Sequence, residues 1–181
     1  MAAADLDGDG RPDLAVVNHF THQVSVLIGL GNGIFAPKVN YASDVSPRSV
    51  VVADMNGDGK PDLVTANSGF GSVSVLLNQG NGTFAAASAY SAVGLASAVA
   101  MTDLNTDGKL DLAVVLEDSN GRVRILLNLG NGTFAAALKY DSGLFLTSVA
   151  AADFNADGRP DLAVVSSGDA KVNVLLTSCL P

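Results

Sequence analysis

One acidic nonapeptide occurs four times in this chain of 181 residues, with the pattern Asp-x-Asp/Asn-x-Asp-Gly-x-x-Asp. The copies are DLDGDGRPD (5–13), DMNGDGKPD (54–62), DLNTDGKLD (103–111) and DFNADGRPD (153–161). Their first residues are 49, 49 and 50 positions apart. A period of about fifty residues is typical of one supersecondary unit that is stacked several times. We therefore expect a repeat array.

Each repeat carries the same order of strand signals, which we label A to D. A short apolar stretch (A) precedes the nonapeptide, and a β-branched run (B), such as LAVV from Leu14, follows it. After a variable gap comes an alternating segment (C), such as VSVLI from Val24. Alternation of this kind is typical of a half-buried strand. A fourth segment (D) ends in Tyr41, Tyr90 or Tyr140.

The motif Gly-Asn-Gly-x-Phe lies between C and D at 31–35, 80–84 and 130–134. Asn-Gly between two strands predicts a type I′ turn, in which both central residues have positive φ. The recurring Phe and Tyr residues are predicted to lie in the core. Because no segment has helical periodicity, we predict an all-β fold, a β-propeller of four-stranded antiparallel blades.

The repeats run over roughly 1–47, 48–96, 97–146 and 147–181 of one domain that spans 1–181. The first repeat offers only Ala2 to Ala4 as strand A, and the fourth contains no Gly-Asn-Gly-x-Phe and no strand D before Pro181. The chain is therefore either a partial propeller, continued by further blades of a longer protein, or a four-bladed ring with one incomplete blade. We favour the partial propeller.

The acidity of the chain is concentrated in the nonapeptides. They hold 13 of the 18 Asp and Glu residues, and the formal net charge is −8. Four divalent cations would neutralise that charge, so we interpret the carboxylates as metal ligands. An acidic chain is not expected to bind nucleic acid. The sequence has no apolar span of twenty residues, so we expect no membrane insertion, and no segment resembles a signal peptide. Cys179 is the single cysteine, which excludes an internal disulfide.

The spacing of the oxygen groups favours calcium. Calcium takes six to eight oxygen ligands, and alternate side chains of a tight loop converge on one point. Positions 1, 3, 5 and 9 carry carboxylates or amides, position 7 offers its carbonyl, and position 6 is always glycine. None of the four loops contains His or Cys, which disfavours zinc and copper. Magnesium seldom occupies a site in which the protein supplies every ligand. An EF-hand needs Glu at position 12, where this chain has Val16, Thr65, Val114 and Val164.

The alternative is that these loops are hairpin turns without an ion. A single loop would leave that alternative open. In four loops of the same pattern, three or four clustered carboxylates repel one another, and a bound cation removes the repulsion.

The acidic loop, followed about twenty residues later by LLNxGNGxF, resembles the FG-GAP/VCBS repeats of integrin α-subunit-like β-propellers, and the resemblance covers essentially the whole chain. It implies a structural calcium ion in each A–B loop, about four in all. The implied ligands, with carbonyl ligands at position 7, are Asp5, Asp7, Asp9, Arg11 and Asp13; Asp54, Asn56, Asp58, Lys60 and Asp62; Asp103, Asn105, Asp107, Lys109 and Asp111; Asp153, Asn155, Asp157, Arg159 and Asp161.

Such sites bind calcium at about 10⁻⁴–10⁻³ M, so we expect a secreted, periplasmic or cell-surface protein. No motif predicts a catalytic centre, and we expect no enzymatic activity. The B–C loops and D–A connections differ between repeats, so we expect them to bind a protein or carbohydrate ligand. The leading hypothesis is a module for adhesion or protein interaction. A lectin and a non-catalytic accessory domain of a secreted hydrolase are the alternatives.

Overall fold

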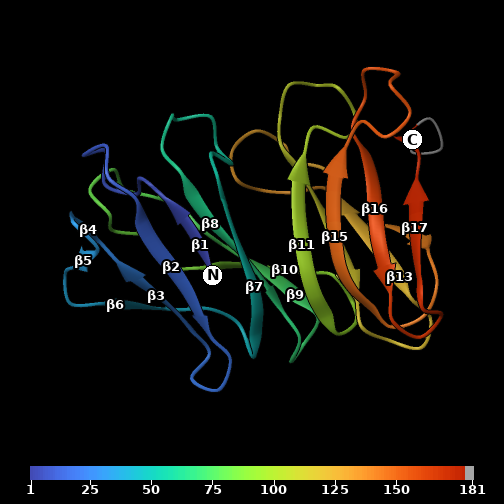
Figure 1. The fold of residues 1–181 in the computed structure, drawn as a ribbon, viewed down its shortest axis with the longest axis horizontal. Helices are drawn as coiled ribbons and strands as arrows, with labels where there is room; N and C mark the ends of the chain where they lie inside the picture. The colour runs from blue at the N-terminus through green and yellow to red at the C-terminus, as the bar shows by residue number, and fades with distance from the viewer. Residues whose placement is uncertain (178–181) are drawn as a thin grey trace.

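The computed structural model describes residues 1–177, so Cys179 and the end of the fourth repeat lie outside the described part. Four antiparallel sheets follow one another in chain order across the molecule (Figure 1). The first two consist of β1 (Ala2–Ala4), β2 (Asp13–Asn18), β3 (Gln23–Leu27) and β6 (Val39–Ala42), then β7 (Pro47–Ala53), β8 (Asp62–Asn67), β9 (Ser72–Leu76) and β10 (Ser88–Ser91). The next two consist of β11 (Ala96–Thr102), β12 (Asp111–Leu116), β13 (Arg122–Leu126) and β14 (Leu138–Asp141), then β15 (Leu146–Ala152), β16 (Asp161–Ser166) and β17 (Lys171–Leu175).

These sheets confirm the predicted all-β fold of antiparallel, propeller-like blades. Strands β1, β7, β11 and β15 contact one another in sequence and form the inner edge of the array. Within residues 1–177, no helix has the length and apolar character to cross a bilayer.

The hydrophobic core lies between neighbouring sheets. The second sheet packs one face against the first and the other face against the third, so every residue of β8 and β9 is buried. We call the side that packs on the preceding sheet the rear face and the side that packs on the following sheet the forward face. In the second sheet, the rear face carries Leu63, Thr65 and Leu76, and the forward face carries Ala66, Val73 and Val75. Three such clusters join the four sheets.

The Asn-Gly motifs form small hairpins that protrude between strands C and D. In the first repeat, β4 (Gly29–Gly31) pairs with β5 (Ile34–Phe35). In the next two repeats the hairpin is reduced to a single bridge, Asn78 with Phe84 and Asn128 with Phe134.

The type I′ prediction holds only for the first of these turns. Asn32 and Gly33 have φ of 52° and 74°. It is wrong for the second and third turns, where only the glycine has positive φ. There the asparagine side chain accepts the backbone N–H of Thr83 or Thr133, a local turn that leaves the asparagine at negative φ.

The recurring aromatic residues join adjacent blades. Tyr41 meets Phe84 edge to face at 5.4 Å between ring centroids, and Tyr90 meets Phe134 at 5.1 Å. Phe84 is buried, and the other rings of this set are partly buried. The prediction that they belong to the core is confirmed for Phe84, and Tyr41, Tyr90, Phe134 and Tyr140 pack against the core clusters. Phe35 is partly buried and belongs to none of these clusters.

Candidate metal sites

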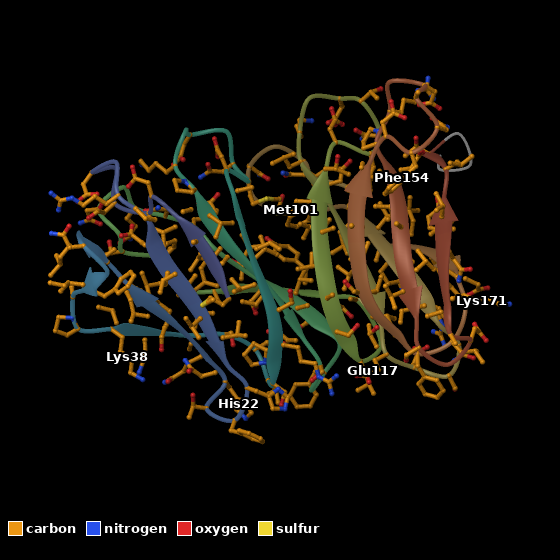
Figure 2. The ribbon with its side chains drawn as sticks, in the orientation of Figure 1. His22, Lys38, Met101, Glu117, Phe154 and Lys171 are labelled. Atoms are coloured by element: carbon orange, nitrogen blue, oxygen red, sulfur yellow. The ribbon has the colours of Figure 1, made fainter. Side chains whose placement is uncertain are left out.

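Each acidic loop closes the hairpin between strands A and B. The last loop residue pairs with the residue that precedes the loop, as Ala53 does with Asp62 and Thr102 with Asp111. All four loops lie at one end of the array. Figure 2 shows Phe154, from the fourth loop, at the end opposite His22 and Glu117, which belong to B–C loops. The acidic loops, which are nearly the same in every repeat, and the B–C loops, which differ between repeats, thus lie at opposite ends of the blades.

The aspartate at position 1 organises each loop around its side chain. In the first loop the Asp5 carboxylate accepts the backbone N–H groups of Gly8, Asp9 and Gly10, at 2.8, 3.1 and 2.8 Å. The glycine at position 6 donates in the same way in the other loops, at 2.7–2.8 Å. Its φ is 81–84° in all four loops, which explains the choice of glycine.

The aspartate at position 9 is fully buried and links two parts of its blade. Asp62 accepts the N–H of Met55 and the N–H of Asn78, both at 2.8 Å. Asp13, Asp111 and Asp161 make the same pair of bonds within their own blades. Sequence reasoning assigned these residues only as metal ligands. Their structural role was missed, although their place at the first residue of a buried strand signals it.

The first loop brings three carboxylates together. Ligand oxygens of Asp5, Asp7 and Asp13 lie within 4.8 Å of one another, the single such group among residues 1–177. Calcium–oxygen distances of 2.3–2.6 Å separate opposed ligands by about 4.6–5.2 Å, so this oxygen set fits a calcium ion. The other loops have Asn at position 3 and supply one carboxylate fewer.

The remaining predicted ligands are held by contacts within their loops. The position-5 carboxylates of Asp9, Asp58 and Asp107 lie 3.1–3.4 Å from the cationic side chain at position 7. They also accept the N–H of that residue, as Asp157 does from Arg159. These surface ion pairs contribute little to stability, so breaking them to let the carboxylate bind a metal ion costs little free energy.

Burial and hydrogen bonding shift the pKa values of the loop aspartates in opposite directions. Burial raises the pKa of Asp62 and of Asp111 above the ordinary aspartate value, and the carboxylates at positions 1 and 5 of the same loop add to the rise. Backbone N–H groups, foremost that of the position-6 glycine, lower the pKa of Asp5 and of Asp153. A nearby cation would favour the ionised form at every position.

The calcium-induced rise in Tm is expected to shrink as the pH falls from 7, beginning above the ordinary aspartate pKa of about 3.9. The raised pKa of Asp62 and Asp111 means that protons compete there with calcium at higher pH than at an ordinary carboxyl. Without calcium, the free energy of unfolding is expected to depend on pH in the opposite sense. The stability that these two carboxyl groups contribute below their unfolded-state pKa is lost as the pH rises through their folded-state pKa. Melting curves of dialysed protein, with and without calcium, test this; an unchanged calcium shift down to about pH 4 would contradict it.

Asparagine residues connect the acidic loops of adjacent blades. The Asn78 side chain donates to the Leu6 carbonyl of the first loop at 2.8 Å and to Pro61 of its own loop at 2.9 Å. Asn128 repeats this with Met55 and Leu110, at 2.9 and 3.1 Å. The recurrence of LLN before the Gly-Asn-Gly motif was the available sequence signal, but the contact across blades was not predicted.

Asn128→Ala is expected to lower the free energy of unfolding by about 2–3 kcal/mol, because it leaves one buried and one partly buried carbonyl group without their donor. Asn131→Ala is the matched control, since Asn131 is exposed and, within the described residues 1–177, its side chain bonds only to Thr133. Urea unfolding of both variants measures the difference. Equal losses in the two variants would show that Asn128 does not connect the blades.

The opposite end of the array contains a cavity of about 590 Å³. Its lining comes from all four blades and includes a charged pair, Arg48 and Glu117, whose side chains contact each other. His19, Ser97 and Thr147 add further polar groups. This cavity lies among the predicted variable loops and inner strand ends.

The sequence of the repeats decides the family. A model described as FG-GAP-like repeat matches residues 5–65, 54–114 and 103–164, which together cover most of the chain. The chain belongs to the FG-GAP-like repeat family. The resemblance predicted from the acidic loops and the Gly-Asn-Gly motifs is thereby confirmed. No curated protein matches the FG-GAP-like chain by sequence.

Three solved structures share the fold. A lectin from Agrocybe aegerita that recognises non-reducing terminal N-acetylglucosamine is 22% identical, with a TM-score of 0.60 over 97% of this chain and 51% of that chain. The V. cholerae biofilm matrix protein Bap1 is 24% identical, with a TM-score of 0.61 over 97% and 26%. The Tc holotoxin pore of Photorhabdus luminescens is 22% identical, with a TM-score of 0.55 over 96% and 9%. The FG-GAP-like chain thus spans about half of one structure and smaller parts of the others.

Proposed function

We propose that this FG-GAP-like chain is a calcium-stabilised, non-catalytic propeller module for adhesion or protein interaction outside the cell. The convergence of Asp5, Asp7 and Asp13 within 4.8 Å is the observation that carries the proposal. Each A–B loop would hold one structural calcium through the carboxylate and amide oxygens at positions 1, 3, 5 and 9 and the carbonyl at position 7. The loops are closed by the protein's own groups, so the ion would supply rigidity and no reaction.

The extracellular setting follows from the expected affinity. Loops of this kind bind calcium at about 10⁻⁴–10⁻³ M, a range that extracellular calcium reaches. Similarity in fold to a biofilm matrix protein supports the same location. The ligand surface would be the end of the array that holds the variable B–C loops and the D–A connections, centred on the cavity with Arg48 and Glu117.

Isothermal titration of the calcium-free protein tests the metal proposal. We expect about four ions per chain, and about three after Asp5→Asn and Asp7→Asn are combined in the first loop. Magnesium at the same concentration serves as the ion control. Heat of binding that is absent, or unaffected by the double variant, would count against calcium in the first loop.

Carbohydrate binding is the second candidate, favoured by the lectin of the same fold and by the polar cavity. A glycan array that includes glycans ending in N-acetylglucosamine tests it, with Arg48→Ala and Phe70→Ala as paired variants. Loss of glycan binding with Arg48→Ala alone would support a site in the cavity. A folded protein that binds no glycan would leave protein interaction as the function.

A further inference from the structure

Two arginines lie side by side on the rear face of the third sheet. Arg122 and Arg124 are two residues apart on β13, so their side chains leave the same face of the strand. Arg124 is directly opposite Val114 of β12, which belongs to the hydrophobic cluster between the second and third sheets. Both arginine side chains therefore extend from the contact between these two sheets.

These guanidinium groups lack hydrogen-bond acceptors. The Nε atoms of Arg122 and Arg124 are buried, and within residues 1–177 neither atom has a hydrogen-bond partner. The Arg122 guanidinium lies 3.9 Å from the Asp118 carboxylate, which is too far for a hydrogen bond. Arg124 forms no ion pair in the described part of the chain. Buried polar groups in native proteins nearly always have a partner, so these Nε–H groups require an acceptor.

The side chains around the two arginines leave a local excess of positive charge. Lys139 of β14 is directly opposite Arg124, and Asp141 is directly opposite Arg122. Lys139 and Asp141 form an ion pair at 3.4 Å. Because Asp141 is used in this way, it leaves Arg124 without a counter-charge. The cluster is thus cationic in a chain whose formal net charge is −8.

The equivalent place at the contact between the first and second sheets holds a carboxylate. Ser72 and Ser74 of β9 occupy the positions that Arg122 and Arg124 occupy in β13. The Ser72 hydroxyl donates to the Asp44 carboxylate at 2.7 Å, and the Ser74 hydroxyl accepts the backbone N–H of Asp44 at 3.1 Å. The fold therefore accommodates an aspartate between strand C of a sheet and the connection that precedes that sheet.

The contact between the second and third sheets lacks this internal carboxylate. Val93 takes the place of Asp44, three residues after the tyrosine of strand D, and is 60% exposed. At the next contact, Asn173 of β17 takes the place of Arg124, and its side chain donates to the Ser142 carbonyl at 2.9 Å. Of β9, β13 and β17, only β13 has buried donors at these positions without a partner in the described part of the chain.

We infer that Arg122 and Arg124 bind an acidic side chain of a partner protein. The partner's carboxylate would take the place that Asp44 takes at the first contact. Guanidinium groups bind carboxylates through paired N–H donors, and these charge-assisted hydrogen bonds are stronger than neutral ones. The inference rests on the proposed role in protein interaction and specifies the chemistry of the partner. Arg122 directly follows a variable B–C loop, so the site belongs to the end of the array proposed as the ligand surface.

Titration with a hexaglutamate peptide tests the inference, with the Nε–H groups of the arginines followed by NMR. The intact chain is dialysed free of calcium, because calcium would bridge the peptide to the acidic loops. We expect saturable shifts at Arg122 and Arg124 and little change at Arg11, which pairs with Asp9. Hexaglutamine is the control for charge. A chain of net charge −8 repels an acidic peptide in general, so binding requires a local cationic site.

Arg124→Ser introduces the residue that the second sheet has at this position. It should weaken hexaglutamate binding by about tenfold or more, because it removes a charge-assisted hydrogen bond. It should not lower Tm, since Arg124 has no counter-charge to lose. Lys38→Ser is the control, because it removes an exposed cation of the first sheet and should leave binding unchanged.

Absence of shifts, equal shifts with hexaglutamine, or equal weakening by Lys38→Ser would overturn the inference. Polygalacturonate, a polysaccharide with carboxylate groups, is titrated in parallel. If it binds through Arg124 and the peptide does not, the assignment to a protein side chain is wrong; binding of the peptide supports that assignment whether or not the polysaccharide also binds. Calcium titration of Arg124→Ser should give the stoichiometry of the parent chain. A chain that binds hexaglutamate but no calcium would contradict the metal proposal alone.

Discussion

Asp62→Ala is expected to lower the free energy of unfolding of the calcium-free protein by about 2–6 kcal/mol. Asp62 is fully buried, and its carboxylate is the acceptor for the N–H groups of Met55 and Asn78. Each buried N–H that loses its acceptor costs about 1–3 kcal/mol. Urea unfolding at neutral pH in the presence of a chelator measures the loss without a contribution from the ion.

Asp58→Ala provides the control within the same loop. Asp58 is exposed, and its contacts are local ones to Lys60 and Asn56. Its replacement should change the calcium-free stability by less than about 1 kcal/mol while still weakening calcium binding. If both variants unfold at the same urea concentration, position 9 has no structural role beyond that of position 5.

Saturating calcium is expected to raise Tm by at least about 5–10 °C. A ligand at a hundredfold excess over its Kd stabilises the native state by about 2.7 kcal/mol per site. One kilocalorie corresponds to about 2–4 °C for a chain of this size, so a single filled site gives this shift and further sites add to it. Differential scanning calorimetry of dialysed protein, with sodium chloride at matched ionic strength as control, measures it.

The origin of the calcium-induced rise in Tm is tested by replacing one ligand in a single loop. Asp7→Asn, in the loop with four aspartates, should reduce the calcium-induced rise while changing the Tm of the calcium-free protein little. An equal rise with calcium and with sodium chloride would show that screening of the net charge of −8, and not coordination, stabilises the chain.

The strands and loops were predictable because their signals are local. Alternating residues from Val24 and the β-branched run from Leu14 specify strands without reference to other blades. The acidic loops were predictable because ligand spacing and a glycine at positive φ are properties of nine consecutive residues. The structure adds that Gly10 donates to Asp5, which orders the loop before any ion binds.

What escaped prediction depends on residues that meet only after the blades pack. Asn78 bonds to Leu6 across 72 positions of sequence, and no local pattern indicates that partner. The double hydrogen bonding of Asp62 also depends on where strand C leaves the sheet. At Asn81 and Asn131, where the type I′ prediction is wrong, the asparagine side chain accepts both the backbone N–H and the hydroxyl of the threonine two residues later. The first turn has Ile34 at that place, which has no hydroxyl to donate.

Because each hydrophobic cluster is shared by two successive sheets, the folding of each sheet should be coupled mainly to the folding of its immediate neighbours. Local opening would then begin at the outermost sheets, each of which loses only one cluster when it detaches. Amide hydrogens of β8, β9 and β12 should exchange with solvent most slowly, and those of β17 should exchange early. Protection from hydrogen exchange that decreases from the middle sheets toward the outer sheets would therefore show that the core is divided among the contacts between sheets.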